Sequence, residues 1–330
     1  MNSHIAVHSP IFMLMSEGFA LFTDEQILAA RPERNGVDPR RPHKFLVEPE
    51  CNADGEIVDV ATLFLINREC PFRCLMCDLW KNTLTEPTSP GDIPEQIHWA
   101  LTRLPAAREI KLYNSGNFFD PKAIPPEDHV AIAEMVCGFE TVIIENHPNL
   151  CREECLRFRD RIVPARLEIA LGLETCHPKL LTTLNKRMTL TDFDRAVSFL
   201  HAAGVRTRAF LLLNPPYLDE FEGLDWTLCS IDYAFDRGVD CCSVIPTRAG
   251  NGMMERLQND GHFSPPKGGA LERVLEKGLL KRRGRVFVDL WDASQFFDCV
   301  ECRKKRIERL HTMNLKQTMR PAIECGECSS

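Results

Sequence analysis

Three cysteines with a distinctive spacing lie in the first third of the chain, in the segment 70–77 (CPFRCLMC). Cys70, Cys74 and Cys77 follow a C-x3-C-x2-C pattern directly after a short apolar run. Three thiolates on one loop can bind three irons of a cubane iron–sulfur cluster and leave the fourth iron without a protein ligand. A zinc site completed by a distant fourth ligand, or three buried thiols, would also give this pattern. The position after a strand favours a 4Fe–4S cluster, which we predict at these three cysteines.

Four further cysteines form two pairs near the end of the chain. Cys299 and Cys302 form one C-x2-C pair, and Cys325 and Cys328 form another. Four thiolates arranged in this way suit a tetrahedral zinc ion, and an auxiliary iron–sulfur cluster is the alternative. We therefore predict a second metal centre there and prefer zinc.

A basic run lies between these two pairs, in a segment with a helical pattern at Arg303–Leu315. Its members are Arg303, Lys304, Lys305, Arg306 and Arg309. Such a run is more often a solvated helix face than a phosphate-binding patch. The formal net charge of −7 argues against a uniformly basic nucleic-acid-binding protein, although it leaves a local patch open.

Strands and helices must position the first cysteine loop, and their pattern is readable along the chain. Six short apolar runs predict strands of a buried parallel sheet. The runs are Thr62–Asn67, Glu109–Tyr113, Thr141–Glu145, Leu167–Leu173, Thr207–Leu213 and Cys241–Ile245. Helical patterns between them are clearest at Ile93–Arg103, Asp128–Val136 and Leu190–Ala203. This α/β alternation fits a partial (β/α)6 barrel or a doubly wound sheet, and periodicity does not separate the two.

The chain divides into three predicted parts: an irregular N-terminal arm at 1–60, a core at 61–262, and a C-terminal extension with the paired cysteines at 263–330. Residues 1–17 contain no Lys or Arg, and no stretch reaches the roughly 20 apolar residues of a membrane span. We therefore expect a cytoplasmic protein without a membrane partner. Most of the scattered cysteines are expected to be small buried apolar residues.

The cysteine spacing after the first core strand resembles the radical S-adenosylmethionine (SAM) superfamily, and the similarity continues through about residues 60–250. Four segments look like those of the radical SAM subunit of archaeosine synthase, in a group near the catalytic subunit of elongator. They are KLYNSGNFFD (111–120), ALGLET (170–175), LLLNPP (211–216) and SVIPT (243–247). The resemblance implies a partial barrel of the radical SAM type, a 4Fe–4S cluster and SAM as cofactors, and an electron donor such as a flavodoxin or ferredoxin.

The resemblance also implies positions that contact SAM, at the carboxyl ends of the strands. They are Asn114, Ser115 and Gly116 after the second core strand, Glu174 after the fourth, Asn214 after the fifth, and Ile245, through its backbone, after the sixth. Ligands of parallel α/β sheets gather at this edge. Glu145 and Asn146 are candidates to face the substrate. Lys186 and Arg208 could bind anions, but isolated basic residues are more often surface charges.

The implied activity is reductive cleavage of SAM at the cluster, followed by abstraction of a hydrogen atom from an organic substrate. The relatives make a tRNA nucleoside a candidate substrate, and a small metabolite or a peptide is the alternative. A zinc-stabilised binding module without catalysis is the alternative of another class. An iron–sulfur electron carrier is disfavoured, because carriers usually give a cluster four protein ligands. The sequence predicts no oligomeric state.

Overall fold

The computed structural model describes residues 19–328. The segment 1–17, on which part of the expected cytoplasmic location rests, lies outside the described residues. No helix within 19–328 combines the length and apolar character needed to cross a membrane.

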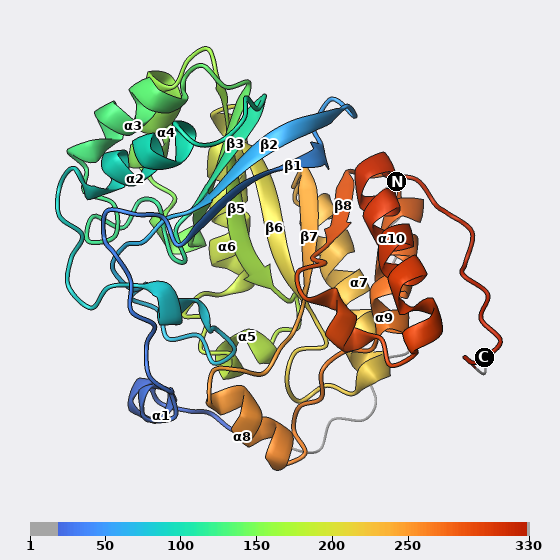
Figure 1. The fold of residues 1–330 in the computed structure, drawn as a ribbon. Coiled ribbons are helices and arrows are strands. Elements are labelled where there is room, and N and C mark those ends of the chain that lie inside the picture. The colour runs from blue at the N-terminus through green and yellow to red at the C-terminus, as the bar shows by residue number, and fades with distance from the viewer. Residues whose placement is uncertain (1–18, 329–330) are drawn as a thin grey trace, which may run out of the picture.

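Eight strands form one open sheet whose spatial order follows the chain (Figure 1). The first two strands are antiparallel, and every other neighbouring pair is parallel. The strands are β1 (Lys44–Cys51), β2 (Ile57–Phe64), β3 (Glu109–Tyr113), β4 (Thr141–Asn146), β5 (Arg166–Glu174), β6 (Arg206–Leu213), β7 (Cys241–Pro246) and β8 (Arg285–Val288).

Helices cover the outer face of the sheet, and the main apolar core lies between them and the strands. The helices are α1 (Asp24–Ala29), α2 (Asp92–Leu101), α3 (Asp128–Val136), α4 (Glu153–Arg161), α5 (Leu180–Thr183), α6 (Leu190–Ala202), α7 (Glu220–Asp236), α8 (Met253–Asn259), α9 (Gly268–Leu280) and α10 (Val300–Lys316). Short 3-10 turns are η2 (Leu79–Asn82), η3 (Pro148–Leu150) and η4 (Ala293–Phe296).

The six predicted strands correspond to β2–β7, although β2 begins five residues earlier and ends three residues earlier than the predicted run at 62–67. The three clearest predicted helices are α2, α3 and α6. The α6 helix begins with a capping box between Thr189 and Asp192, and Gly204 follows it with a positive φ of 70°. Side chains from strands that are not neighbours meet across the concave face of the sheet, which a flat doubly wound sheet does not allow. The fold is therefore the predicted partial barrel.

The expectation of an irregular segment at 1–60 was wrong, because that segment contains α1, β1 and the start of β2. Asn52 forms the turn between β1 and β2, where its side chain accepts hydrogen bonds from the amides of Asp54 and Glu56. Since β1 and β8 belong to the same sheet as the core strands, the sheet extends past both predicted boundaries. The division at 61 and 263 remains a prediction about domains.

A buried ionic network fills the amino half of the concave face. Arg208 on β6 donates to Glu168 on β5 at 2.7 Å and to Glu50 on β1 at 2.9 Å. Lys111 on β3 also contacts Glu50, and Arg285 on β8 donates to Glu168 at 2.7 Å. Burial opposes ionisation of Glu168, but the two guanidinium groups outweigh it and lower the pKa of Glu168 to about 2. The expectation that Arg208 is a surface charge was wrong; its side chain is 3% exposed.

The outer edge of β8 pairs with side chains instead of another strand. Asn314 on α10 accepts from the amide of Val288 at 3.1 Å and donates to the carbonyl of Val288 at 2.8 Å. Just after the helix, Gln317 makes the same two bonds with Val286, at 2.9 and 3.0 Å. The α10 helix also contacts β1, so it packs against both edge strands of the open sheet.

Candidate functional site

The predicted cluster ligands lie on the loop that leaves the carboxyl end of β2. Cys74 is buried, whereas Cys70 and Cys77 keep some accessible surface. The amide of Leu75 donates to the carbonyl of Leu184 at 2.9 Å, and the side chain of Asn251 donates to the carbonyl of Leu75 at 2.7 Å. These bonds attach the loop to segments that follow β5 and β7. The loop therefore lies at the sheet edge where parallel α/β proteins bind their ligands.

Three arginines converge on Glu69, the residue before Cys70. Arg31 and Arg73 contact the carboxylate at 2.7 and 2.9 Å, and Arg34 contacts it as well. Arg31 and Arg34 come from the segment before β1, so this segment is fastened directly to the cysteine loop. Three guanidinium groups around one carboxylate leave net positive charge next to the loop, whereas burial raises the pKa of the Cys70, Cys74 and Cys77 thiols.

A buried ion pair lies beside Cys74. Lys186 donates to Glu174 at 2.6 Å, and both side chains are about nine-tenths buried. Burial opposes the charge on Lys186, but the carboxylate of Glu174 outweighs it and raises the pKa of Lys186. The expectation of a surface charge at Lys186 was therefore wrong. A methyl group at Gly172 would approach both Lys186 Nζ and Glu174 Oε1 to 2.4 Å, so a larger residue here would displace the ion pair.

Three of the predicted SAM-contacting residues have left-handed backbone conformations at strand ends. The φ angles are 51° at Ser115, 65° at Glu174 and 56° at Asn214. The left-handed conformation of Glu174 occurs at a β-bulge between Gly172 and Glu174. Non-glycine residues adopt this region at a cost, and such strain concentrates at ligand sites. The strained ends of β3, β5 and β6 therefore lie where the sequence predicts the SAM contacts.

Two predicted SAM-contacting side chains contain buried oxygens without a hydrogen-bond partner in the described part of the chain. They are Oδ1 of Asn114 and Oδ1 of Asn214. Gly116 lies close to the cysteine loop, because a methyl group placed on it would be 3.7 Å from Cys70 Cβ. Ile245 packs in the same apolar cluster as Leu75 of the cysteine loop. The residues predicted from the strand ends thus lie at the same edge of the sheet as the cysteine loop, while their individual contacts with SAM remain predictions.

Glu145, at the carboxyl end of β4, holds the segment after β3 in place. Its carboxylate accepts hydrogen bonds from the amide of Asn114 at 2.6 Å and from the amide of Gly116 at 3.3 Å. Burial outweighs these bonds and raises the pKa of Glu145 to about 7. Glu145 therefore fixes the backbone of the segment that is predicted to bind SAM.

We expect the Glu145→Gln variant to lose part of the pH dependence of stability. A carboxyl group whose pKa is raised on folding stabilises the fold fully below its unfolded pKa of about 4.5, and this contribution disappears as the pH rises through 7. Urea unfolding at several pH values between 4.5 and 8 measures the effect. The variant should lose less stability across this range than the unchanged protein; equal losses would contradict the assignment.

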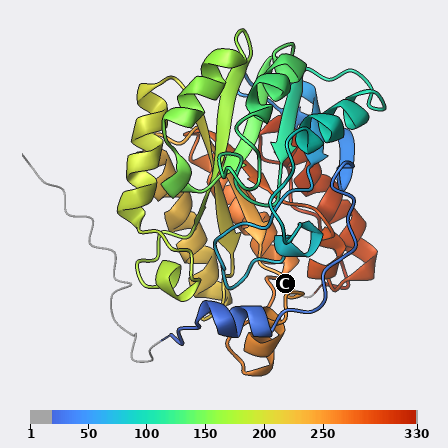
Figure 2. The same cartoon turned by 90° about the vertical axis from the view of Figure 1, so that its left-hand side faces the viewer.

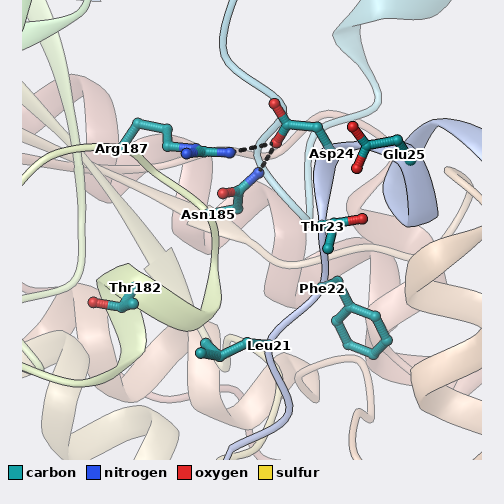
Figure 3. A pocket seen from close by; sticks show the side chains of 8 residues that line it. All are labelled: Leu21, Phe22, Thr23, Asp24, Glu25, Thr182, Asn185 and Arg187. Carbon is teal, nitrogen blue, oxygen red and sulfur yellow. Dashed lines mark hydrogen bonds and ion pairs between the residues drawn. The ribbon is translucent and has the colours of Figure 1, made fainter.

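A second apolar cluster covers the carboxyl ends of the strands, and α1 and α8 lie there (Figure 2). Ile27 of α1 and Met254 of α8 pack with Leu75 in this cluster. Outside it, Asn185 donates to Asp24 and to the carbonyl of Arg73, both at 2.7 Å. Figure 3 shows Asn185 and Arg187 directed at Asp24, next to a cavity of about 350 Å³. The α1 segment is thus connected to the cysteine loop on this side as well.

The four C-terminal cysteines converge, as the sequence predicts. Among residues 19–328, they are the one group of three or more Cys, His, Asp or Glu side chains whose ligand atoms all lie within 4.8 Å of one another. Cys299 Sγ is 3.8 Å from Cys325 Sγ, and Cys302 Sγ is 3.4 Å from Cys328 Sγ. Sulfurs bound at about 2.3 Å to one tetrahedral ion lie roughly 3.8 Å apart. The group therefore fits a single metal ion.

The loop cysteines do not form such a compact group, since Cys70, Cys74 and Cys77 fall outside that 4.8 Å criterion. A cubane contains four irons, so its cysteine sulfurs are further apart than those around one ion. Asn117 donates to Cys70 Sγ at 3.2 Å, which is the kind of hydrogen bond that cluster ligands receive. Binding of a cluster by Cys70, Cys74 and Cys77 therefore remains a prediction, whereas the C-terminal cysteines already form a compact group.

Two of the five residues in the basic run on α10 are occupied by partners within the protein. Arg306 contacts Glu272, and the buried Arg309 contacts Glu272 and Glu276 on α9. Arg309 also donates to the carbonyl of Pro321 at 2.7 Å, which holds the segment leading to Cys325. These two arginines are therefore structural, and a phosphate-binding patch would have only Arg303, Lys304 and Lys305 available.

Comparison with known proteins identifies archaeal relatives. An uncharacterised protein of Methanocaldococcus jannaschii is 22% identical over 323 residues, which cover 90% of this chain and 87% of that protein. Archaeosine synthase subunit beta of Methanosarcina acetivorans is 29% identical over 204 residues, 58% of each protein. The same subunit of Thermococcus kodakarensis is 31% identical over 163 residues, 48% of this chain and 50% of that protein. The match thus spans little more than half of these two subunits.

Two other comparisons add less. No family model matches the chain. Among solved structures, Methanocaldococcus infernus Elp3 with an N-terminal deletion is 13% identical and has a TM-score of 0.48, over 68% of this chain and 59% of that one. A likeness this weak carries no argument about function.

Proposed function

Because the chain is related to the beta subunits of archaeosine synthase and resembles the radical SAM superfamily, we propose that it is a radical SAM enzyme. Cys70, Cys74 and Cys77 would bind a 4Fe–4S cluster at the carboxyl end of β2. The observation that carries the proposal is the convergence of this loop with the strained ends of β3 and β5 and with the Lys186–Glu174 pair. Such a cluster, once bound and reduced, supplies the electron that cleaves SAM.

The residues of the chain would bind and orient the cofactors. Lys186 would contribute a positive charge beside Cys74, which its partner Glu174 offsets in part. Asn114, Ser115 and Gly116 after β3 would contact one end of SAM, and Glu174 would contact it from β5. Asn214 and the backbone near Ile245 would contact its other end. The apolar cluster that contains Leu75 would help to exclude water from this region.

A tRNA nucleoside is the substrate class that we favour, because the curated relatives are named for archaeosine synthesis. A small metabolite or a peptide is the alternative. An electron donor such as a flavodoxin or ferredoxin and a cytoplasmic location complete the proposal. A metal-stabilised binding module without catalysis would not need the strained strand ends, so we place it second.

Formation of 5′-deoxyadenosine tests the proposal. The protein is reconstituted anaerobically with iron and sulfide, supplied with SAM and dithionite, and the product is measured by mass spectrometry. We expect 5′-deoxyadenosine from the unchanged protein and from Cys229→Ala, whose cysteine is exposed and outside both metal sites. Cys74→Ala should form none. A protein that binds no iron, or an unchanged yield from Cys74→Ala, would refute the proposal.

SAM binding tests the predicted contact at Gly116. An added methyl group there meets protein atoms at 3.6–3.8 Å, so the Gly116→Ala variant should fold normally. It should nevertheless bind SAM roughly tenfold more weakly, a loss of about 1.4 kcal/mol, because the methyl group would occupy space beside the cluster. Gly138→Ala is the matched control, since its methyl group meets nothing within 4 Å. Equal affinities in equilibrium dialysis would remove Gly116 from the SAM site.

For the C-terminal centre we propose zinc, on the basis of the sulfur separations of 3.8 and 3.4 Å. A variant with Cys70, Cys74 and Cys77 replaced by Ala should purify anaerobically with about one zinc per chain, because four thiolates remain. Additional replacement of Cys302 and Cys328 should abolish this zinc. Elemental analysis measures both results, and iron in place of zinc in the first variant would favour the auxiliary cluster.

A further inference from the structure

Four aromatic side chains form a connected group on the concave face, above the ionic network. The rings of Tyr113 on β3 and Phe210 on β6 lie 6.1 Å apart, although β4 and β5 separate these strands in the sheet. Phe64 on β2 lies 6.2 Å from Tyr113 and 6.5 Å from Trp291, which follows β8. Contacts between such distant strands are possible only across the interior of the partial barrel. We call Phe64, Tyr113, Phe210 and Trp291 the aromatic tier.

The aromatic tier lies next to the predicted SAM site. Tyr113 directly precedes Asn114, and Phe210 is paired in register with Gly172, two residues before Glu174. On β5, the inward positions at this level are Ala170 and Gly172, which have almost no side chain. The Lys186–Glu174 pair occupies the space in front of Gly172, so the aromatic tier borders this pair as well as the predicted SAM site.

The rings of the aromatic tier retain accessible surface despite their interior position. Phe64, Tyr113 and Phe210 are half-buried, and Trp291 is 48% exposed. Protein surrounds Tyr113 closely enough that burial raises its pKa well above the ordinary value. Lys44 covers one face of Trp291, with its Nζ 3.5 Å from the ring centroid. A group that entered the barrel would thus meet aromatic surface from β2, β3, β6 and the segment after β8.

Two buried threonine hydroxyl groups, on β2 and just after β7, have no hydrogen-bond partner within the described residues. Thr62 has the same inward orientation on β2 as Phe64, is 3% exposed, and its Oγ1 has no hydrogen-bond partner among residues 19–328. Thr247, just after β7, is equally buried, and its Oγ1 also lacks a partner in that range. Buried hydroxyl groups are nearly always hydrogen-bonded, so an exception requires an explanation such as a ligand. Rings and hydroxyl groups together suit a planar ligand with polar edges.

The geometry points to a binding subsite for a planar heteroaromatic ring, a nucleobase in the substrate, formed by the aromatic tier with Thr62 and Thr247 as hydrogen-bonding groups. This inference rests on the proposed function, since the subsite lies next to the predicted SAM site. Stacking on aromatic side chains tolerates any base, because every base has a π-face. The two hydroxyl groups would then select among bases by their edges.

Binding of guanosine to the cluster-loaded protein tests the subsite, with ribose as the non-planar control. Equilibrium dialysis is done with saturating SAM, so that the adenine ring of the cofactor already occupies its own site. We expect guanosine to bind and ribose not to bind. The Trp291→Leu variant should bind guanosine about tenfold more weakly, and it should fold because about half of Trp291 is exposed. Trp99→Leu, on the outer helix α2, is the matched control and should bind normally.

Other outcomes would overturn the subsite. If saturating SAM abolishes guanosine binding, the aromatic tier belongs to the adenine of the cofactor. If guanosine, adenosine, cytidine and uridine all fail to bind at millimolar concentration while 5′-deoxyadenosine still forms, the subsite is wrong and the proposed enzyme stands. If guanosine binds but no 5′-deoxyadenosine forms, the subsite is supported and the proposed enzyme fails. Unchanged binding by both Trp291→Leu and Phe210→Leu would also refute the subsite.

Discussion

The Glu168→Gln variant is expected to lose about 3–5 kcal/mol of its free energy of unfolding, measured in urea at pH 7. Glu168 is 1% exposed and is the carboxylate that joins Arg208 to Arg285 inside the barrel. Without its charge, the two guanidinium groups and Lys111 would share Glu50 as their remaining carboxylate partner in this network. Burying uncompensated positive charge is much more costly than losing an exposed ion pair.

The matched control for Glu168 is Glu140→Gln. Glu140 pairs with Arg108 at 2.7 Å, but both side chains are about half exposed, so this change should cost at most about 1 kcal/mol. The pH dependence gives a second check, because the pKa of Glu168 is lowered to about 2. Its stabilisation is present above the unfolded pKa of about 4.5 and is lost as the pH falls towards 2. Equal costs for Glu168→Gln and Glu140→Gln would show that the network does not stabilise the fold.

The Lys186→Met variant is expected to lose about 3 kcal/mol of unfolding free energy and to bind less iron. The change leaves the buried carboxylate of Glu174 without its cation at 2.6 Å, and it removes a positive charge beside Cys74. Adding Glu174→Gln should restore most of the stability, because the unpaired charge is then removed as well. Iron binding should stay partly reduced in this double variant, because Lys186 lowers the pKa of Cys74 more strongly than Glu174 raises it.

Urea unfolding and iron analysis of the same samples separate these two effects. The matched control is Lys281→Met, whose partner Asp232 lies on α7 and is 45% exposed; it should change stability by less than about 1 kcal/mol. A double variant no more stable than Lys186→Met would mean that the loss comes from packing around the lysine side chain. Normal iron content in all variants would remove Lys186 from the environment of the cluster.

The central strands were predictable from the sequence, and the edge strands were not. The runs at 109–113 and 241–245 are continuous apolar segments of parallel strands, which have a strong local signal. By contrast, β1 carries alternating charged residues, and β8 has four residues, too few to distinguish from a loop. The turn at Asn52–Gly55 was an available signal for the β1–β2 hairpin, because Asp-Gly between apolar runs is typical of hairpins.

The candidate site was predictable where ligand spacing is local, as in both cysteine groups. The Lys186–Glu174 pair was not predictable, because the sequence around an isolated lysine does not show whether the folded chain buries its side chain. The same holds for Arg306 and Arg309, whose carboxylate partners lie more than thirty residues earlier on α9. Long-range pairing of charges depends on the topology of the whole fold, and composition or periodicity does not reveal it.

The amide groups of Asn314 and Gln317 bear on how the chain can be shortened in practice. They occupy two amides and two carbonyls of β8 that a further strand would otherwise bind. A chain cut before α10 would present these four groups to other molecules, and such edges promote association between sheets. A truncation that removes Cys325 and Cys328 to simplify metal analysis should therefore keep the residues through 317. Otherwise, a loss of solubility would be mistaken for a loss of metal.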